Sequence, residues 1–104
     1  MSFEGKETEF SAKKLQLGES GIITGCGNSM TPILKNGQKV FVEPVDIMTN
    51  LEKDDIVFCK VGGHYYLHKI ISVKGRRYQI GNNHGKVNGW VGRENIYGKV
   101  TKIL

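Results

Sequence analysis

The chain has 104 residues, of which 38% are hydrophobic and 24% are charged, so its composition suits one domain with a modest core and excludes a disordered chain. The formal net charge is +5 and the pI is about 9.3, but the basic residues occur singly or in pairs and never in a long run. We therefore interpret the charge as a solvated basic surface and do not expect nucleic acid as a partner.

No apolar stretch approaches the roughly 18 residues that a transmembrane helix needs, and residues 1–25 lack the pattern of a signal peptide. We therefore expect no membrane span and a cytoplasmic location. The two cysteines, Cys26 and Cys59, form no CxxC pair, and the histidines are dispersed, so we expect neither a metal site nor a cofactor. A disulfide between them and two reduced thiols are equally compatible with the sequence.

The first part of the chain, residues 1–20, is polar and carries few large apolar side chains. This indicates an N-terminal arm or a short edge element, partly mobile, with no helical periodicity longer than a turn or two. Residues 21–25, GIITG, predict a short strand. After the Asn36-Gly37 turn, the alternating segment KVFVEPV predicts a strand over residues 38–45.

Strands separated by turn signals continue to the C-terminus. The segment DIVFCKV predicts a strand, Gly62-Gly63 a hairpin turn, and HYYLHKIISV the returning strand. After Lys74-Gly75, RRYQI predicts another strand, GNNHGKVNGW a loop with an Asn-Gly turn at 88–89, and YGKVTKIL the closing strand. The pattern predicts a single, small all-β domain of hairpins and coiled strands over residues 21–104.

The strand HYYLHKII places His68 in its middle, on the same face as Tyr66 and Ile70. A histidine held there is either a hydrogen-bonded structural residue or a general base. Ser29, in the segment GNSMTP, is by itself an ordinary turn former. Because a serine becomes a nucleophile only when a neighbouring base takes its proton, Ser29 and His68 make a reactive pair if the fold brings them together.

The segments GNSMTPIL, VFVEPV, LEKDDIVFCKV, YYLHKII and RENIYGKV follow one another as the blocks of one protease superfamily do. Over residues 25–104 the chain resembles the signal peptidase I/LexA superfamily of serine proteases. The resemblance implies the fold of the LexA/signal peptidase catalytic core, with Ser29 as the nucleophile and His68 as the general base. Because LHKI is similar to the VHRI of endoplasmic-reticulum-type signal peptidases, the chain looks like a soluble minimal form of the Ser-His branch.

The resemblance also implies the surroundings of this pair. The oxyanion hole would use the backbone N–H of Ser29, with Asn28 as its neighbour. Asn82 and Asn88 stand where we look for the carboxylate that orients the histidine in the family. An extended peptide with small side chains would lie along an exposed strand edge. The candidates for its pocket are Ile23, Met30, Ile33 and Val57, although Met30 equally suits an apolar plug of the core.

Some features separate the chain from the family. It shows no membrane anchor, and an amide replaces the orienting carboxylate, which can cost about 10⁴ in rate where a triad needs it. Cys26-Gly27 abuts the serine too closely for LexA-type self-cleavage. The sequence therefore predicts a soluble serine endopeptidase acting on a peptide or protein, of the kind that a phage or mobile element would encode. The alternative is a catalytically weak or inactive module of the same fold that binds a peptide, or a host or partner protein.

Overall fold

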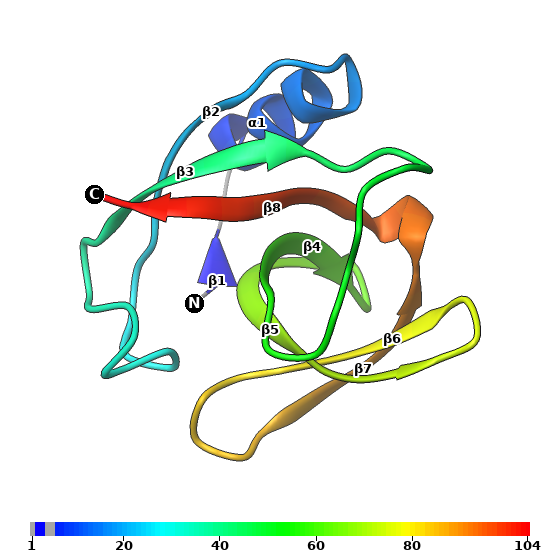
Figure 1. Ribbon diagram of the computed structural model, residues 1–104. Helices are drawn as coiled ribbons and strands as arrows, with labels where there is room; N and C mark the ends of the chain where they lie inside the picture. The colour runs from blue at the N-terminus through cyan, green and yellow to red at the C-terminus, as the bar shows by residue number, and fades with distance from the viewer. Residues whose placement is uncertain (1, 4–5) are drawn as a thin grey trace.

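The computed structural model describes residues 2–3 and 6–104, with side chains from Glu9 onward. The strands form one curled antiparallel sheet, so the predicted all-β class is confirmed (Figure 1). The elements in chain order are β1 (Ser2–Phe3), α1 (Lys6–Gln16), β2 (Gly21–Thr24), β3 (Lys39–Pro44), β4 (Ile56–Val61), β5 (His64–Lys74), β6 (Arg77–Gly81), β7 (Val87–Gly92), the 3-10 turn η1 (Arg93–Asn95) and β8 (Ile96–Ile103).

The C-terminal strand β8 lies in the middle of the sheet, whose order is β2-β3-β8-β4-β5-β6-β7. Val42 of β3 is the partner of Val100 on one side of β8, and Val57 of β4 is the partner of Lys99 on the other. The long strand β5 pairs with β4 near its start and with β6 towards its end. The sheet therefore curls around β4 and β5, which places the middle of β5 inside the molecule (Figure 1).

Alternating side chains divide the core into two clusters, one on each side of the curled sheet. The first cluster is Ala12, Leu15, Ile23, Met30, Leu34, Val40, Val42, Phe58, Leu67 and Tyr97. The second is Leu51, Val57, Cys59, Val61, Ile70, Tyr78, Ile80, Val91 and Ile96. Adjacent residues of β4, Val57 and Phe58, belong to different clusters, as the two-residue period of a strand requires.

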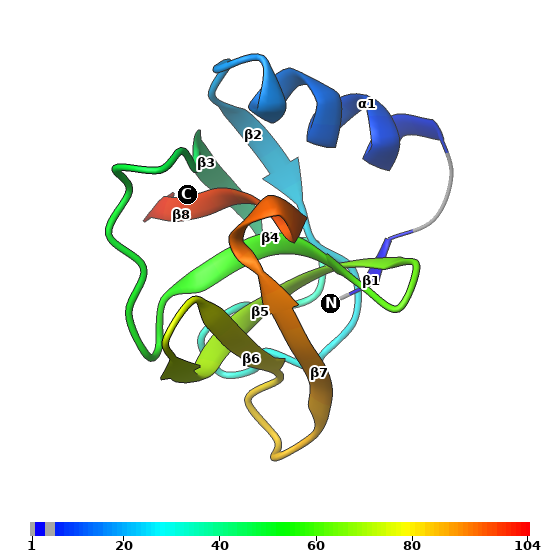
Figure 2. The same ribbon diagram turned by 90° about the vertical axis from the view of Figure 1, so that its right-hand side faces the viewer.

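Helix α1 corrects the interpretation of residues 1–20 as an arm without helical periodicity. Ala12 and Leu15 lie three positions apart and are buried in the first cluster, so one narrow stripe of the helix covers β2 and β3 (Figure 2). The other large apolar residues there, Phe10 and Leu17, are exposed, which is why the periodic signal is weak. The helix ends at Gln16, and Gly18 just beyond it takes a φ of 88°, the left-handed conformation with which glycine terminates helices.

The two described residues ahead of this helix do form a short edge element. Ser2 and Phe3 make β1, which pairs antiparallel with Tyr66 and Tyr65 of β5. The N-terminal segment is thus a two-residue strand followed by a helix.

The expectation of a loop over GNNHGKVNGW is confirmed for residues 82–86 but wrong for the rest of the segment. Residues Val87–Gly92 form β7, and the predicted Asn-Gly turn at Asn88-Gly89 lies inside this strand. The turn comes earlier, where Asn82 Oδ1 accepts hydrogen bonds from the backbone N–H groups of His84 and Lys86, at 2.8 and 3.0 Å. An Asn side chain that mimics a backbone turn thus closes the β6–β7 hairpin, and Asn88 becomes a strand residue whose side chain faces β5.

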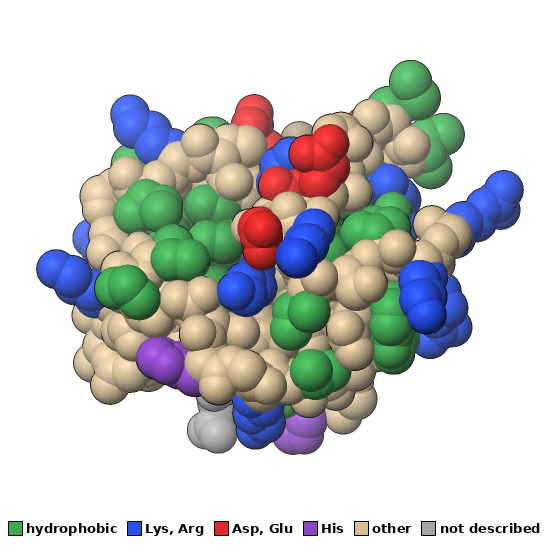
Figure 3. Space-filling model, turned by 60° about the horizontal axis from the view of Figure 1, so that its bottom comes forward, with side chains coloured by type: hydrophobic (Ala, Val, Ile, Leu, Met, Phe, Trp, Pro, Cys, Tyr) green, Lys and Arg blue, Asp and Glu red, His purple; other side chains and the backbone are tan. Residues whose placement is uncertain are grey.

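The basic residues are spread over the surface as the sequence indicated. Figure 3 shows Lys and Arg side chains separated by polar and hydrophobic ones on the face that it displays. Within the described residues, no helix is long and apolar enough to cross a membrane. Both cysteines are free, with Cys26 exposed and Cys59 buried, so they form no disulfide.

Candidate active site

Ser29 lies in the loop between β2 and β3, and hydrogen bonds hold this loop in one shape. Gly27 takes a positive φ of 95° and donates its N–H to Oδ1 of Asn36 at 2.9 Å. Met30 and Leu34 follow the serine, are fully buried in the first core cluster, and are joined by a backbone hydrogen bond of 2.9 Å. The half-buried serine is therefore held in place next to the buried side chains of Met30 and Leu34 and does not lie at a mobile loop tip.

His68 comes from the middle of β5 and is 3% exposed. On the neighbouring strand β4 it is the register partner of Val57, so its ring lies on the side of the second core cluster. The ring of Tyr66, two residues earlier on the same face, stacks on it with 4.8 Å between ring centroids. The strand and the tyrosine together restrict how the imidazole can turn.

A chain of hydrogen bonds joins three residues that are far apart in the sequence. Oγ of Ser29 lies 3.1 Å from Nε2 of His68, and Nδ1 of the same ring lies 2.7 Å from Oδ1 of Asn88 on β7. Because the asparagine oxygen can only accept, Nδ1 carries the proton and Nε2 presents its lone pair to the serine hydroxyl. This is the tautomer that a general base requires.

Burial is the main electrostatic influence on this histidine. Removal from water lowers the pKa of His68 from 6.5 to about 4, nearby Lys86 acts in the same direction, and the hydrogen bond to Asn88 opposes them. The imidazole is therefore neutral at pH 7. A neutral ring can accept a proton, but the burial of the site disfavours the charged imidazolium that results.

Asn83 fastens the β6–β7 turn to the serine loop. Its backbone N–H donates to the carbonyl oxygen of Ser29 at 2.9 Å, and its side-chain Nδ2 donates to the carbonyl oxygen of Thr31 at 2.9 Å. Its Oδ1 accepts a hydrogen bond from Nζ of Lys69 at 3.0 Å. Lys69, on the strand face opposite His68, is thus linked to the serine loop through an amide.

A second histidine lies against the outer side of the same loop. Nε2 of His84, which is exposed, is 2.9 Å from Oγ1 of Thr31 and 3.0 Å from the carbonyl oxygen of Asn28. The threonine hydroxyl also donates to that carbonyl at 2.9 Å. These contacts close the turn around Ser29 from the solvent side.

The structure brings some of the sequence-derived candidates together and separates others. Ser29, His68 and Asn88 are in contact, and Asn28 lies in the serine turn with its carbonyl oxygen bound by Thr31. Asn82 does not orient the ring in this structure, because its side chain is engaged by the backbone of its own turn. Sequence reasoning missed Asn83, for which the repeated asparagine in GNN was the available signal.

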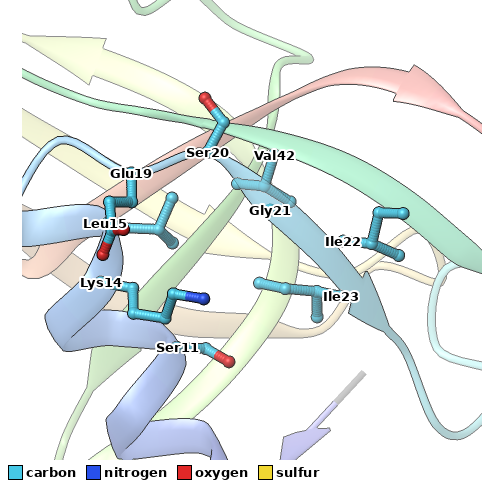
Figure 4. Close-up of a pocket in the computed structure, with 9 residues that line it drawn as sticks. All are labelled: Ser11, Lys14, Leu15, Glu19, Ser20, Gly21, Ile22, Ile23 and Val42. Carbon is cyan, nitrogen blue, oxygen red and sulfur yellow. The ribbon is translucent and has the colours of Figure 1, made fainter.

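The four pocket candidates do not form one wall. Met30 and Val57 expose no surface, because they pack in the first and the second core cluster. Ile23 lines a hollow of about 90 Å³ between α1 and β2, where Leu15 and Lys14 lie on its helix side (Figure 4). Ile33 is 44% exposed and is the one candidate of the four with a large accessible surface.

No protein-family model matches the chain, and a comparison with curated proteins finds no matching relative.

Proposed function

We propose that the protein is a serine endopeptidase in which Ser29 is the nucleophile, His68 is the general base and Asn88 orients the base. The observation that carries this proposal is the pair of hydrogen bonds through one imidazole, 3.1 Å from Ser29 Oγ to Nε2 and 2.7 Å from Nδ1 to Asn88 Oδ1. Nucleophile, base and orienting group within hydrogen-bond reach form the arrangement that activates a serine.

In the proposed reaction, Oγ of Ser29 attacks a peptide carbonyl carbon while Nε2 of His68 takes the hydroxyl proton. The tetrahedral intermediate collapses as the imidazolium returns that proton to the leaving amine, which breaks the C–N bond and leaves an acyl-enzyme. Water, deprotonated by the same nitrogen, then hydrolyses the ester. Asn88 holds the Nδ1–H through both steps.

Two properties of the site favour a slow enzyme. Asn88 accepts a hydrogen bond but brings no negative charge to stabilise the imidazolium. The lowered pKa of His68, about 4, makes the ring a weaker base than an ordinary histidine. The same pKa keeps the base unprotonated over a wide range, so activity would extend to mildly acidic pH.

An extended peptide is the substrate that the sheet suits best. Within the described part of the sheet, β7 is the last strand in the order and it carries Asn88. The outer edge of such a strand can pair with a peptide main chain. The resemblance to signal peptidases and LexA-type proteases adds the expectation of small side chains next to the scissile bond.

The test is covalent labelling of Ser29. A fluorophosphonate probe is incubated with the protein, Ser29→Ala and His68→Gln, and each is examined by intact-mass and peptide mass spectrometry. We expect an adduct on Ser29 in the wild type, none in Ser29→Ala, and labelling slowed at least a hundredfold in His68→Gln. Ser20→Ala, a serine outside the site, is the matched control and should label like the wild type.

The neutral Asn88 also supports a second function, a peptide-binding module of the same fold without turnover. This function predicts a folded protein that the probe does not label, while peptides that bind shift its NMR resonances around Ser29 and Asn88. Labelling of Ser29 at a rate that depends on His68 contradicts it.

A further inference from the structure

Strand β5 has neighbours on both of its edges. β4 pairs with His64 to Lys69 along one edge, and β6 pairs with Lys69 to Lys74 along the other. Because β4 already pairs with Tyr65 and Tyr66 on its own edge, β1 reaches these two residues from the edge that β6 follows further along. β1 and β6 therefore lie one after the other on the same edge of β5.

Ser29 lies beside the interval between β1 and β6. On this edge, Leu67 and His68 separate the residues that pair with β1 from those that pair with β6. The backbone N–H of Asn83, which follows the end of β6, donates to the carbonyl oxygen of Ser29 at 2.9 Å, and Oγ of Ser29 is 3.1 Å from Nε2 of His68. The serine loop and β1 are thus neighbours along one edge of β5.

Both ribbon views place β1 near the loop that carries Ser29. In Figure 1, β1 lies between β5 and the chain that leads from β2 into this loop. Figure 2 shows β1 close to the same chain and to β5. A peptide that pairs with β5 next to Ser29 therefore needs the space that β1 occupies.

The register of β1 leads towards the site. β1 pairs antiparallel with β5, and Ser2 lies opposite Tyr66. Each step towards the N-terminus of a strand in this position is therefore a step towards the C-terminus of β5. An extended peptide in the same register that continues by two residues beyond the place of Ser2 reaches the position opposite His68. β1 thus follows the pairing that brings a peptide main chain to Ser29.

The pairing of β1 is weak enough to be exchanged. β1 has two residues and, in the part of the sheet that the structure describes, pairs with β5 alone. Pairing of so few residues is marginal by itself. Helix α1 begins at Lys6 and is anchored in the first core cluster by Ala12 and Leu15, so β1 stays tethered close to β5. A short tether of this kind gives an effective concentration on the order of millimolar, with which a free peptide must compete.

We propose that β1 is an autoinhibitory strand, which occupies the edge of β5 where a substrate peptide pairs and must be displaced before the peptide reaches Ser29. The inference rests on the proposed peptidase function, and it adds the edge at which the substrate arrives and the segment that regulates access. An extended polypeptide is the competitor, because β1 and β6 are both held on this edge by antiparallel main-chain pairing. This edge belongs to the strand that carries His68 itself, whereas β7 carries Asn88.

Proline substitution in the full chain tests this role of β1. The variant Ser2→Pro/Phe3→Pro removes the two backbone N–H donors of β1 and should free the edge of β5. The probe is the octapeptide MSFEGKET, residues 1–8 of the chain, added to isotope-labelled protein. We expect it to bind the proline variant at least about fivefold more tightly than the wild type, because the apparent affinity falls with the fraction of molecules whose edge is free. The bound peptide should shift the NMR amide resonances of residues 65–68.

Two controls separate main-chain pairing from other effects. The variant Ser2→Thr/Phe3→Tyr keeps both backbone donors and should bind the octapeptide within about twofold of the wild type. The same octapeptide with proline at its second and third positions lacks these donors and should bind neither protein. Circular dichroism of each variant establishes that it is folded.

Fluorophosphonate labelling connects this edge with Ser29. Saturating octapeptide should slow the labelling of Ser29 in the proline variant at least about fivefold, because only molecules with a free edge react. No difference in affinity between the wild type and the proline variant, binding by neither included, overturns the proposal, and so do resonance shifts confined to Val87–Gly92 or labelling that the octapeptide does not slow. The expected difference in affinity without labelling of either protein supports the role of β1 at a peptide-binding edge and contradicts the peptidase.

Discussion

Asn88 lies on the far side of the His68 ring from Ser29, with its Oδ1 2.7 Å from Nδ1 of the imidazole. An aspartate in this position would accept the same hydrogen bond and would also stabilise the protonated ring by charge. With an amide there, the geometry of a base is present without the electrostatic support of its charged form.

Replacement of Asn88 by Asp should therefore raise the reactivity of Ser29. A carboxylate at Oδ1 raises the pKa of His68 and stabilises the imidazolium that forms during attack. We expect the rate of fluorophosphonate labelling at pH 7 to increase at least tenfold in Asn88→Asp and to fall at least tenfold in Asn88→Ala. If both variants label at the wild-type rate, Asn88 does not act through His68.

The burial of His68 predicts that the protein loses stability in acid. Its pKa is about 4 in the folded protein against 6.5 for an unperturbed ring. As the pH falls from 6.5 to 4, the unfolded chain takes up a proton that the folded chain refuses, so the free energy of unfolding decreases. The full effect is on the order of 3 kcal/mol at 1.36 kcal/mol per pKa unit and is absent above pH 6.5.

Urea unfolding at several pH values measures this loss. The variant His68→Gln has no group that titrates at this position, so its stability should change less between pH 6.5 and pH 4. His64→Gln removes an exposed histidine and is the matched control, which should keep the wild-type slope. Parallel curves for His68→Gln and wild type would contradict the assigned pKa.

Asn83 should affect the reactivity of Ser29 only by fixing the position of the serine loop. Its side chain joins the carbonyl oxygen of Thr31 to the ammonium of Lys69, so Asn83→Ala releases one attachment of the serine loop. We expect labelling to slow about tenfold to a hundredfold, because small displacements of a nucleophile are costly. The pH at half-maximal rate should stay at the wild-type value, whereas a shifted pH profile would indicate an electrostatic role.

The fold was largely predictable from local patterns. Alternating apolar residues and the Gly62-Gly63 turn predicted the β4–β5 hairpin, in which both glycines have positive φ. Helix α1 was not predicted because, among its residues from Glu9 onward, Ala12 and Leu15 alone are buried, while Phe10 and the following Leu17 are exposed. A helix stabilised by so few contacts lacks the periodic signal on which sequence reasoning depends.

The site was less accessible to sequence reasoning, since its members are distant in the chain. Ser29 and His68 are separated by 39 positions, and only the resemblance to a protease superfamily suggested pairing them. The role of Asn88 was obscured because Asn88-Gly89 reads as a turn, whereas the turn chemistry of Asn82 places it within β7. The repeated asparagine in GNN marked the position of Asn83, but its partners include backbone carbonyl groups of a distant loop, which a sequence pattern does not identify.

The two cysteines should differ sharply in reactivity. Burial raises the pKa of Cys59 to about 12, whereas Cys26 is exposed in the serine loop. Iodoacetamide at pH 8 should therefore add one carbamidomethyl group to the native protein and two in urea. The variant Cys26→Ser should take up none when folded, and rapid alkylation of Cys59 in that variant would show that the strand β4 is more open than its burial indicates.

The docking of α1 predicts unequal effects for two leucines near its end. Leu15 is 4% exposed and packs in the first core cluster, whereas Leu17 is 80% exposed. Leu15→Ala should lower the free energy of unfolding by about 2–4 kcal/mol, because it removes buried methyl groups and leaves a cavity against the sheet. Leu17→Ala is the matched control and should change the stability by no more than about 0.5 kcal/mol. Equal, small effects in urea unfolding of both variants would mean that the helix contributes nothing to the core and that the N-terminal segment behaves as a free arm.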